Sequence, residues 1–209
     1  MSDGYFSFLF EKSDIALEFV EDEHIYLANG VIVPSVTQIM QASFPDKYAG
    51  IAYSRLQAAA ERGTAIHRVV EGYVNYGVST PLTDELRGYR FLERTYGFKS
   101  VTAEMPLIYC QRGKPVFAGR MDLLLDDGGT TLADIKTTAI LDKEWLKVQL
   151  NLYLLAFEQC YGEKVTGLKG IHLRGQTRKY VNIPIDTQCA KDALKKYKDT
   201  LKKAKEVTQ

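Results

Sequence analysis

Two strand-like runs joined by a short glycine-rich turn constrain the fold of this chain more than any other feature. The runs cover about residues 115–126 and 130–138, and Asp127-Gly128-Gly129 separates them. Because successive side chains of a strand alternate between the faces of a sheet, the length of this turn decides which residues of the two runs share a face. The sequence thus leaves two registers open, and each builds a different site.

The two registers differ in where they place two aspartates. A two-residue turn sets Asp122 opposite Ala133, so that the carboxylates of Asp122 and Asp134 face opposite sides of the sheet. A three-residue turn sets Asp122 opposite Asp134, and its last glycine, Gly129, suits the left-handed conformation that such turns require. We therefore predict the three-residue turn, which brings the two Cβ atoms to about 5 Å from each other.

Strict alternation divides the first run into two faces. One face is expected to hold Arg120, Asp122 and Leu124. The other face is expected to hold Phe117, Gly119, Met121, Leu123 and Leu125. In the second run, Asp134 and Lys136 share a face.

Two facing carboxylates repel each other and perturb each other's pKa unless a cation lies between them, and their hard oxygens suit Mg²⁺ or Mn²⁺.

Several residues elsewhere could complete such a site. His67 and the main-chain carbonyl of Ile135 are candidate ligands, and an imidazole ligand shifts the preference toward Mn²⁺. Lys136 would orient the attacking water or stabilise charge that develops on a phosphate. Glu71, one helical turn after His67, would orient that ring or be a surface acid. Glu104, on the preceding strand, would join the acids.

Each piece also has an ordinary explanation. An Asp-x-Lys tripeptide is frequent by chance, and a single histidine on a helix is more often structural. Gln149 and Tyr153 share a helix face, where they would reach the substrate or merely form the flank of the helix. A functional site is favoured because the order of these residues, and the faces of the strands and helices on which they fall, would allow one cleft to use all of them.

This order resembles that of the PD-(D/E)XK nuclease superfamily, in its RecB-like and phage exonuclease branch. The resemblance rests on Gly63-x-x-x-His67, Gly119-Arg120-x-Asp122, Asp134-Ile135-Lys136 and Gln149-x-x-x-Tyr153. It covers about residues 60–155 and extends more loosely to residue 30. The chain departs from the pattern in two places, since Met121 rather than proline precedes Asp122 and the second acid is aspartate rather than glutamate.

The resemblance implies a restriction-endonuclease-like core that cleaves DNA with Mg²⁺ or Mn²⁺. By position it makes His67, Asp122 and Asp134 metal ligands and Lys136 the catalytic lysine, with Gln149 and Tyr153 as the trailing motif. Some RecB-like relatives hold an iron–sulfur cluster on four cysteines. This chain has three scattered ones, Cys110, Cys160 and Cys189, so no cluster is expected.

Turn and capping signals predict the remaining elements. Asn29-Gly30 marks a hairpin within residues 15–33, and Ser35 with Gln38 forms a capping box for a short helix. A helix over about 48–76 is expected to break near glycine 63. The other expected elements are a helix over 84–96 between Thr83 and Gly97, strands near 100–110, 115–126 and 130–138, a helix near 142–160, strands near 166–174 and 178–184, and a lysine-rich helix near 186–206.

This element order predicts an α/β or α+β fold with a central mixed sheet flanked by helices. At 209 residues, we expect one nuclease-like domain, with the hairpin and short helix in 1–45 and the core in 46–209. No apolar run approaches the roughly 18 residues that span a membrane, and residues 1–5 do not begin a signal peptide. We therefore expect a cytoplasmic protein with reduced thiols, in a bacterial or phage-infected cell.

The balance of 27 basic and 26 acidic residues argues against broad, charge-driven adhesion to nucleic acid but leaves room for a local basic groove. The main expected phosphate contacts are Arg62, Arg68, Arg120 and Lys147. Arg120 would equally serve as a salt-bridge partner. Further candidates are Arg55, Arg174, Arg178 and Lys179, while the lysines of the last helix are more typical of a solvated face. Without a base-reading motif, the contacts would not be sequence-specific.

These features favour a metal-dependent DNA nuclease, with an exonuclease role in recombination, repair or phage DNA processing. One alternative is a DNA-end-binding or scaffolding subunit that keeps the fold without turnover, and another is a different metal-dependent hydrolase that uses the same acids. A recombination or annealing protein is an expected partner. The resemblance also allows a homo-oligomer, including a ring-forming exonuclease.

Overall fold

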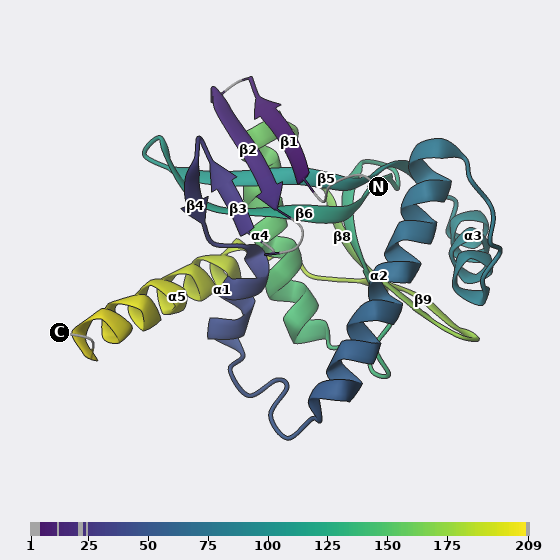
Figure 1. Cartoon of the computed structure of the whole chain (residues 1–209). Helices are drawn as coiled ribbons and strands as arrows, with labels where there is room; N and C mark the ends of the chain where they lie inside the picture. Colours follow the sequence, from purple (N-terminus) through teal and green to yellow (C-terminus); the bar gives the residue numbers. More distant parts are fainter. Residues whose placement is uncertain (1–4, 12, 21–22, 24, 208–209) are drawn as a thin grey trace.

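The computed structural model describes residues 5–11, 13–20, 23 and 25–207 (Figure 1). Within these residues the chain forms a four-stranded sheet, a five-stranded sheet and five helices. The five-stranded sheet is mixed and is flanked by helices, which confirms the predicted fold class. The predicted absence of a signal peptide rested on residues 1–5, and residues 1–4 lie outside the described part of the chain.

The mixed sheet has the strand order β5-β6-β7-β8-β9. Its strands are β5 (Lys99–Gln111), β6 (Lys114–Asp126), β7 (Thr130–Lys136), β8 (Gly167–Arg174) and β9 (Thr177–Asn182). Neighbouring strands are antiparallel except β7 and β8, which pair in parallel. A parallel pair needs a long crossover connection, and α4 (Lys143–Tyr161) supplies it.

The turn between β6 and β7 has the predicted length of three residues. Asp126 pairs with Thr130, and the ladder continues regularly as far as Leu123 opposite Ala133. The left-handed position falls on Gly128, at φ +73°, instead of on the second glycine as predicted. The predicted register is therefore confirmed, and one more step along it leads to Asp122 and Asp134.

Strict alternation fails at the middle of β6, so the predicted division of this strand into two faces is wrong. Met121 packs in the core beneath α4, whereas Leu123 packs in a second core beneath α2 and α3. On the neighbouring strand the residue between the Ala103–Leu123 and Met105–Met121 pairs is Glu104, which has a left-handed backbone at φ +56°. This local irregularity changes the direction of the side chains that follow, which the two-residue period cannot foresee.

The N-terminal sheet is an antiparallel meander that lies across β5 and β6 (Figure 1). Its strands are β1 (Tyr5–Phe10), β2 (Ile15–Val20), β3 (Ile25–Ala28) and β4 (Val31–Val33). The predicted Asn29-Gly30 turn is confirmed, with φ values of +49° and +74°. Strand β1 was not predicted. The sheet buries residues such as Leu17 against Ile108 and Ala118 of the mixed sheet.

The helices cover both faces of the mixed sheet. Helices α1 (Val36–Ser43), α4 and α5 (Thr187–Val207) contribute to the core on one side, and α2 (Tyr53–Tyr76) and α3 (Asp84–Tyr96) to the core on the other. In Figure 1, α2 and α3 lie to the right, α1 and α5 to the left, and α4 overlaps the middle of the sheet. In the described part of the chain, no helix is long and apolar enough to cross a membrane.

The predicted helix signals are confirmed except at one position. Ser35 and Gln38 form both hydrogen bonds of the capping box, and Thr83 caps α3. Helix α2, however, runs unbroken through Gly63, where a break was predicted. A glycine costs a helix only about 1 kcal/mol relative to alanine, and burial of Ile66 and other residues of α2 outweighs that cost.

Candidate metal centre and active site

A cleft of about 940 Å³ opens between the N-terminal sheet, α2, β5, β6 and α4. Most of the residues expected to act in catalysis or metal binding line it. They are His67, Glu71, Glu104, Asp122, Asp134, Lys136, Gln149 and Tyr153. Residues far apart in the sequence thus meet in one place, as the order and phase of the motifs predicted.

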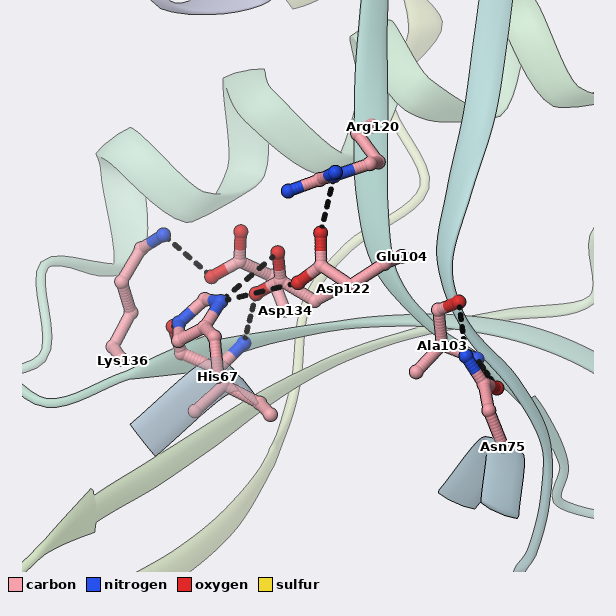
Figure 2. A network of polar contacts seen from close by, with 9 residues as sticks. His67, Asn75, Ala103, Glu104, Arg120, Asp122, Asp134 and Lys136 are labelled. Carbon is pink, nitrogen blue, oxygen red and sulfur yellow. Dashed lines mark hydrogen bonds and ion pairs between the residues drawn. The ribbon is translucent and has the colours of Figure 1, made fainter. Parts of the chain in front are cut away.

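His67 reaches the cleft from α2 and contacts three groups. Its Nε2 lies 3.1 Å from the carbonyl oxygen of Ile135, and its Nδ1 lies 3.5 Å from Asp122 and 3.6 Å from Glu104 (Figure 2). In a neutral ring, donation from Nε2–H to the carbonyl leaves the Nδ1 lone pair facing the two acids. Burial opposes charge on this ring, but the carboxylates of Asp122 and Glu104 outweigh burial and raise the pKa of His67 well above its usual value.

Asp122 is held by the strand beside it. Its Oδ2 accepts a hydrogen bond of 2.7 Å from the backbone N–H of Ile135, and the residue is 9% exposed. Burial favours the neutral acid, but the facing imidazole of His67, the ammonium of Lys136 and this N–H together lower the pKa of Asp122. The carboxylate is therefore ionised and aimed into the cleft.

Asp134 is the least satisfied polar group of the site. It is 1% exposed, and neither carboxylate oxygen accepts a well-aligned hydrogen bond from the described residues. The ammonium of Lys136 approaches Oδ2 to 2.5 Å as an ion pair. Burial, followed by the charge of Asp122, raises the pKa of Asp134 to about 6, although Lys136 opposes this rise. Lone pairs left unfilled at a buried acid mark a place for a cation.

Lys136 keeps its charge in this environment. Burial would lower the pKa of its ammonium, but the carboxylates of Asp134 and Asp122 outweigh burial and raise it. The ammonium also lines the cleft. A fixed positive charge therefore lies beside the two acids, where it can stabilise negative charge on a bound phosphate.

Glu104 belongs to the site more closely than its position in the sequence indicates. Ligand atoms of His67, Glu104 and Asp122 lie within 4.8 Å of one another, so these three could hold one ion. The other oxygen of Glu104 pairs with Nε of Arg120 at 2.6 Å (Figure 2). Of the two roles foreseen for Arg120, the salt bridge is therefore formed, while the guanidinium also lines the cleft.

Gln149 and Tyr153 form the wall contributed by α4. Gln149 accepts a hydrogen bond of 3.2 Å from the indole N–H of Trp145, and Tyr153 is 6% exposed. Burial, followed by the charges of the two aspartates, raises the pKa of Tyr153 well above its usual value, so its hydroxyl stays protonated. A Cβ at Gly119 would lie 3.0 Å from the Tyr153 ring and 3.1 Å from Val36, which explains a glycine at this point of β6.

The basic residues predicted to contact phosphate fall into two groups. Arg68 and Arg120 line the cleft. Arg62 and Lys147 are not among the described residues that line it. The ammonium of Lys147 instead pairs with Asp186 at 2.7 Å. The lining does include Glu71, whose orienting role toward the histidine stays a prediction.

No feature of the sequence indicated that the N-terminal sheet would contribute to the cleft. Phe19 and Tyr26 both line it, and the guanidinium carbon of Arg120 lies 5.7 Å from the centre of the Phe19 ring. Burial raises the pKa of Tyr26 to about 12. Aromatic residues in a hairpin are ordinary core residues, so no signal in the sequence could have separated these two from the rest.

The donor set fits a hard divalent cation. Carboxylate oxygens and one imidazole are ligands that Mg²⁺ and Mn²⁺ accept, and the buried carboxylate of Asp134 lies beside them. A mixed sheet that carries two acids and a lysine on adjacent strands is the arrangement expected of a metal-dependent phosphodiester hydrolase.

Comparison with protein families agrees with this class. The chain belongs to the PD-(D/E)XK nuclease superfamily, whose model matches residues 78–208. The matched region includes Asp122, Asp134 and Lys136, whereas His67 lies outside it. Proteins of this superfamily are generally metal-dependent nucleases, so the substrate is a nucleic acid.

Two further comparisons add little. No match was found among curated proteins. Among solved structures, the chain is similar to one described as the crystal structure of SSO0001, with a TM-score of 0.45 and 18% sequence identity over 81% of this chain and 75% of that chain. A likeness of this degree carries no argument about function.

Proposed function

We propose that this protein is a Mg²⁺- or Mn²⁺-dependent deoxyribonuclease that hydrolyses phosphodiester bonds. The observation that carries the proposal is the state of Asp134, a buried carboxylate without a well-aligned hydrogen bond that lies between a second acid and a lysine. Burial of this carboxylate beside a second acid is costly, because the one ammonium of Lys136 faces both acids. A site that receives a cation with its substrate explains it.

The chain's own residues would share the work of holding the metal. His67, Glu104 and Asp122 would be its ligands together with Asp134. The carbonyl of Ile135, also predicted as a ligand, lies 3.1 Å from Nε2 of His67, on the other side of the ring from the nitrogen that faces the acids. The bound ion would supply a Lewis acid that polarises a phosphate oxygen and makes water a better nucleophile.

The remaining residues would act on the phosphate and the attacking water. Lys136 keeps a positive charge beside Asp134, so it would orient the water or stabilise charge that develops on the phosphate. Tyr153 remains protonated and would donate a hydrogen bond to the substrate. Gln149 is held in place by Trp145, which fixes the direction of its carboxamide.

DNA would lie in the cleft with its phosphates against basic side chains. Arg68 and Arg120 line the cleft and would contact the backbone without reading bases. The resemblance to RecB-like and phage enzymes supports an exonuclease in recombination, repair or phage DNA processing. It also supports a recombination or annealing protein as a partner and a homo-oligomeric assembly.

One assay tests the proposal directly. The purified chain is incubated with 5′- or 3′-labelled linear DNA and with circular DNA, in Mg²⁺, Mn²⁺ or EDTA. An exonuclease degrades the linear DNA only, in either metal and not in EDTA. Cleavage of circles would replace exonuclease by endonuclease action, and tight binding of linear ends without cleavage in either metal would favour the end-binding or scaffolding subunit instead.

A further inference from the structure

A side chain outside the cleft holds the strand that carries Glu104. Asn75 lies near the C-terminal end of α2, and its carboxamide forms two hydrogen bonds with Ala103 (Figure 2). The N–H of Ala103 donates to Oδ1 at 2.8 Å, and Nδ2 donates to the carbonyl of Ala103 at 3.1 Å. The hydroxyl of Thr102 donates to the same Oδ1 at 3.2 Å.

These bonds replace those of a neighbouring strand. β5 is an edge strand of the mixed sheet, so on its outer side the backbone groups of Ala103 have no strand to pair with. A carboxamide presents one acceptor and one donor in the arrangement of a peptide group, and Asn75 offers both to the same residue. The backbone at Ala103 is thus fixed on both sides, by Leu123 of β6 and by α2.

The residue that follows Ala103 needs this support. Glu104 has a left-handed backbone at φ +56°, and a residue with a side chain keeps such a conformation only where its surroundings hold it. In this conformation its carboxylate reaches two partners, with one oxygen 3.6 Å from His67 and the other 2.6 Å from Arg120. A relaxed, extended backbone would direct the carboxylate elsewhere.

We propose that Asn75 is a positioning residue for the cation site. It fixes the backbone at Ala103 so that Glu104 turns its carboxylate toward His67 and Asp122. Helix α2 therefore acts on the site twice, through the imidazole that it contributes and through the carboxamide eight residues later. This inference rests on the proposed function, because it requires that the site bind a divalent ion.

The test measures Mn²⁺ affinity by titration calorimetry on the full chain. We expect Asn75→Ala to weaken binding by roughly tenfold, as loss of an outer support of a metal ligand commonly does. Because Asn75 acts through Glu104, the double variant Asn75→Ala/Glu104→Gln should bind within about threefold of Glu104→Gln alone. If Asn75 only stabilised the fold, the losses of Mn²⁺ binding free energy from the two substitutions would add.

Tyr73→Phe is the matched control. Tyr73 lies on the same helix and donates one hydrogen bond of 2.8 Å to Glu93 on α3, so its loss weakens α2 without removing either hydrogen bond between Asn75 and Ala103. We expect its Mn²⁺ affinity to stay within about twofold of the wild type. If circular dichroism shows that Asn75→Ala does not fold, Asn75→Asp replaces it in the comparison with Glu104→Gln. Asn75→Asp keeps the acceptor for the N–H of Ala103 and loses the donor to its carbonyl.

The outcomes separate this inference from the proposed function. The role of Asn75 would be overturned by additive losses, or by an Asn75 variant that binds Mn²⁺ as well as Tyr73→Phe does. In that case the metal site itself would still be supported if the wild type binds Mn²⁺ and His67→Ala does not. A wild-type chain that does not bind Mn²⁺ would overturn the proposed function itself. Non-additivity together with an unaffected control supports the positioning role.

Discussion

The two walls of the cleft hold negative charge in opposite ways. On the wall built by β6 and β7, Asp134 is buried without a well-aligned hydrogen bond, and burial beside Asp122 raises its pKa to about 6. On the wall built by α2, β5 and the N-terminal sheet, Glu104 forms an ion pair of 2.6 Å with Arg120. At Asp134 the nearby ammonium of Lys136 faces two acids, Asp134 and Asp122, whereas Glu104 has an arginine partner that β6 supplies.

This difference shows which wall requires the cation. An acid that already has an arginine partner is stable without an ion, so Glu104 can be positioned before metal or substrate arrives. Two acids that share one ammonium are stabilised further when a second cation joins them. We therefore assign the chemistry to the β6–β7 wall and the orientation of ligands and substrate to the other.

The largest effect is expected from the β6–β7 wall. Asp134→Asn and Lys136→Ala should each lower the rate of DNA cleavage by roughly a thousandfold or more, because they remove a metal ligand and the charge that faces the phosphate. Release of labelled nucleotides under single-turnover conditions measures this.

Lys169→Ala is the control for the lysine, since Lys169 pairs with Asp127 at 3.0 Å and is not among the described residues that line the cleft. It should cleave at the wild-type rate. If both Asp134→Asn and Lys136→Ala stay within tenfold of the wild type, the catalytic assignment is wrong.

The next effect concerns the stability of the metal-free protein. A carboxyl whose pKa is raised by folding stabilises the fold below its unfolded pKa, near 3.8, and this contribution is lost as the pH rises through about 6. A rise of this size corresponds to roughly 3 kcal/mol. In EDTA, Asp134→Asn should therefore gain stability relative to the wild type by about 2 kcal/mol between pH 4 and pH 8, because the unfolded carboxyl is already partly ionised at pH 4.

Urea unfolding followed by circular dichroism at several pH values measures this difference. Asp186→Asn is a control of opposite sign, because a hydrogen bond from Lys147 lowers the pKa of Asp186 and its contribution is lost as the pH falls. A difference between Asp134→Asn and the wild type that does not change with pH would show that Asp134 is not strained in the folded protein.

The packing of β6 against α1 and α4 depends on close contacts between distant segments. Gly119→Ala should destabilise the protein by about 1–3 kcal/mol, because its Cβ would lie 3.0 Å from Tyr153 and 3.1 Å from Val36. Gly63→Ala is the control, since its Cβ would make an ordinary contact of 3.5 Å with Thr137 inside a continuous helix. It should be neutral or gain up to about 1 kcal/mol. Equal losses in the two variants would contradict the closure of α1 and α4 on β6.

The smallest effect distinguishes two basic residues that the sequence predicted together. Arg68 lines the cleft, and Lys147 pairs with Asp186. In EDTA, Arg68→Ala should weaken DNA binding several-fold and reduce the salt dependence by about one ion, whereas Lys147→Ala should change neither. Fluorescence anisotropy across a range of salt concentrations measures both quantities, and similar losses in the two variants would show that DNA extends beyond the cleft.

The sequence alone determined the centre of the site because that centre is local. A three-residue turn and the two-residue period of a strand set Asp122 and Asp134 on neighbouring strands and Lys136 on the same face as Asp134. The helix ends were also predictable, since Ser35 and Thr83 bond to backbone groups only a few residues away. Such rules act over short distances along the chain, so most of them hold whatever the rest of the fold does, and the two-residue period of β6 fails only beside Glu104.

Only the tertiary structure decided the other wall, because its parts are brought together by packing between distant segments. The left-handed backbone of Glu104, which ends the regular alternation of β6, depends on contacts with α2 and β6 that no local period encodes. The places of Phe19 and Tyr26 in the cleft depend on how the N-terminal sheet lies across the mixed sheet. Arg68 and Lys147 differ in which face of their helix they occupy, because both α2 and α4 line the cleft but only Arg68 of these two is part of the lining. Charge patterns in the sequence do not say which face of a helix turns toward a cleft.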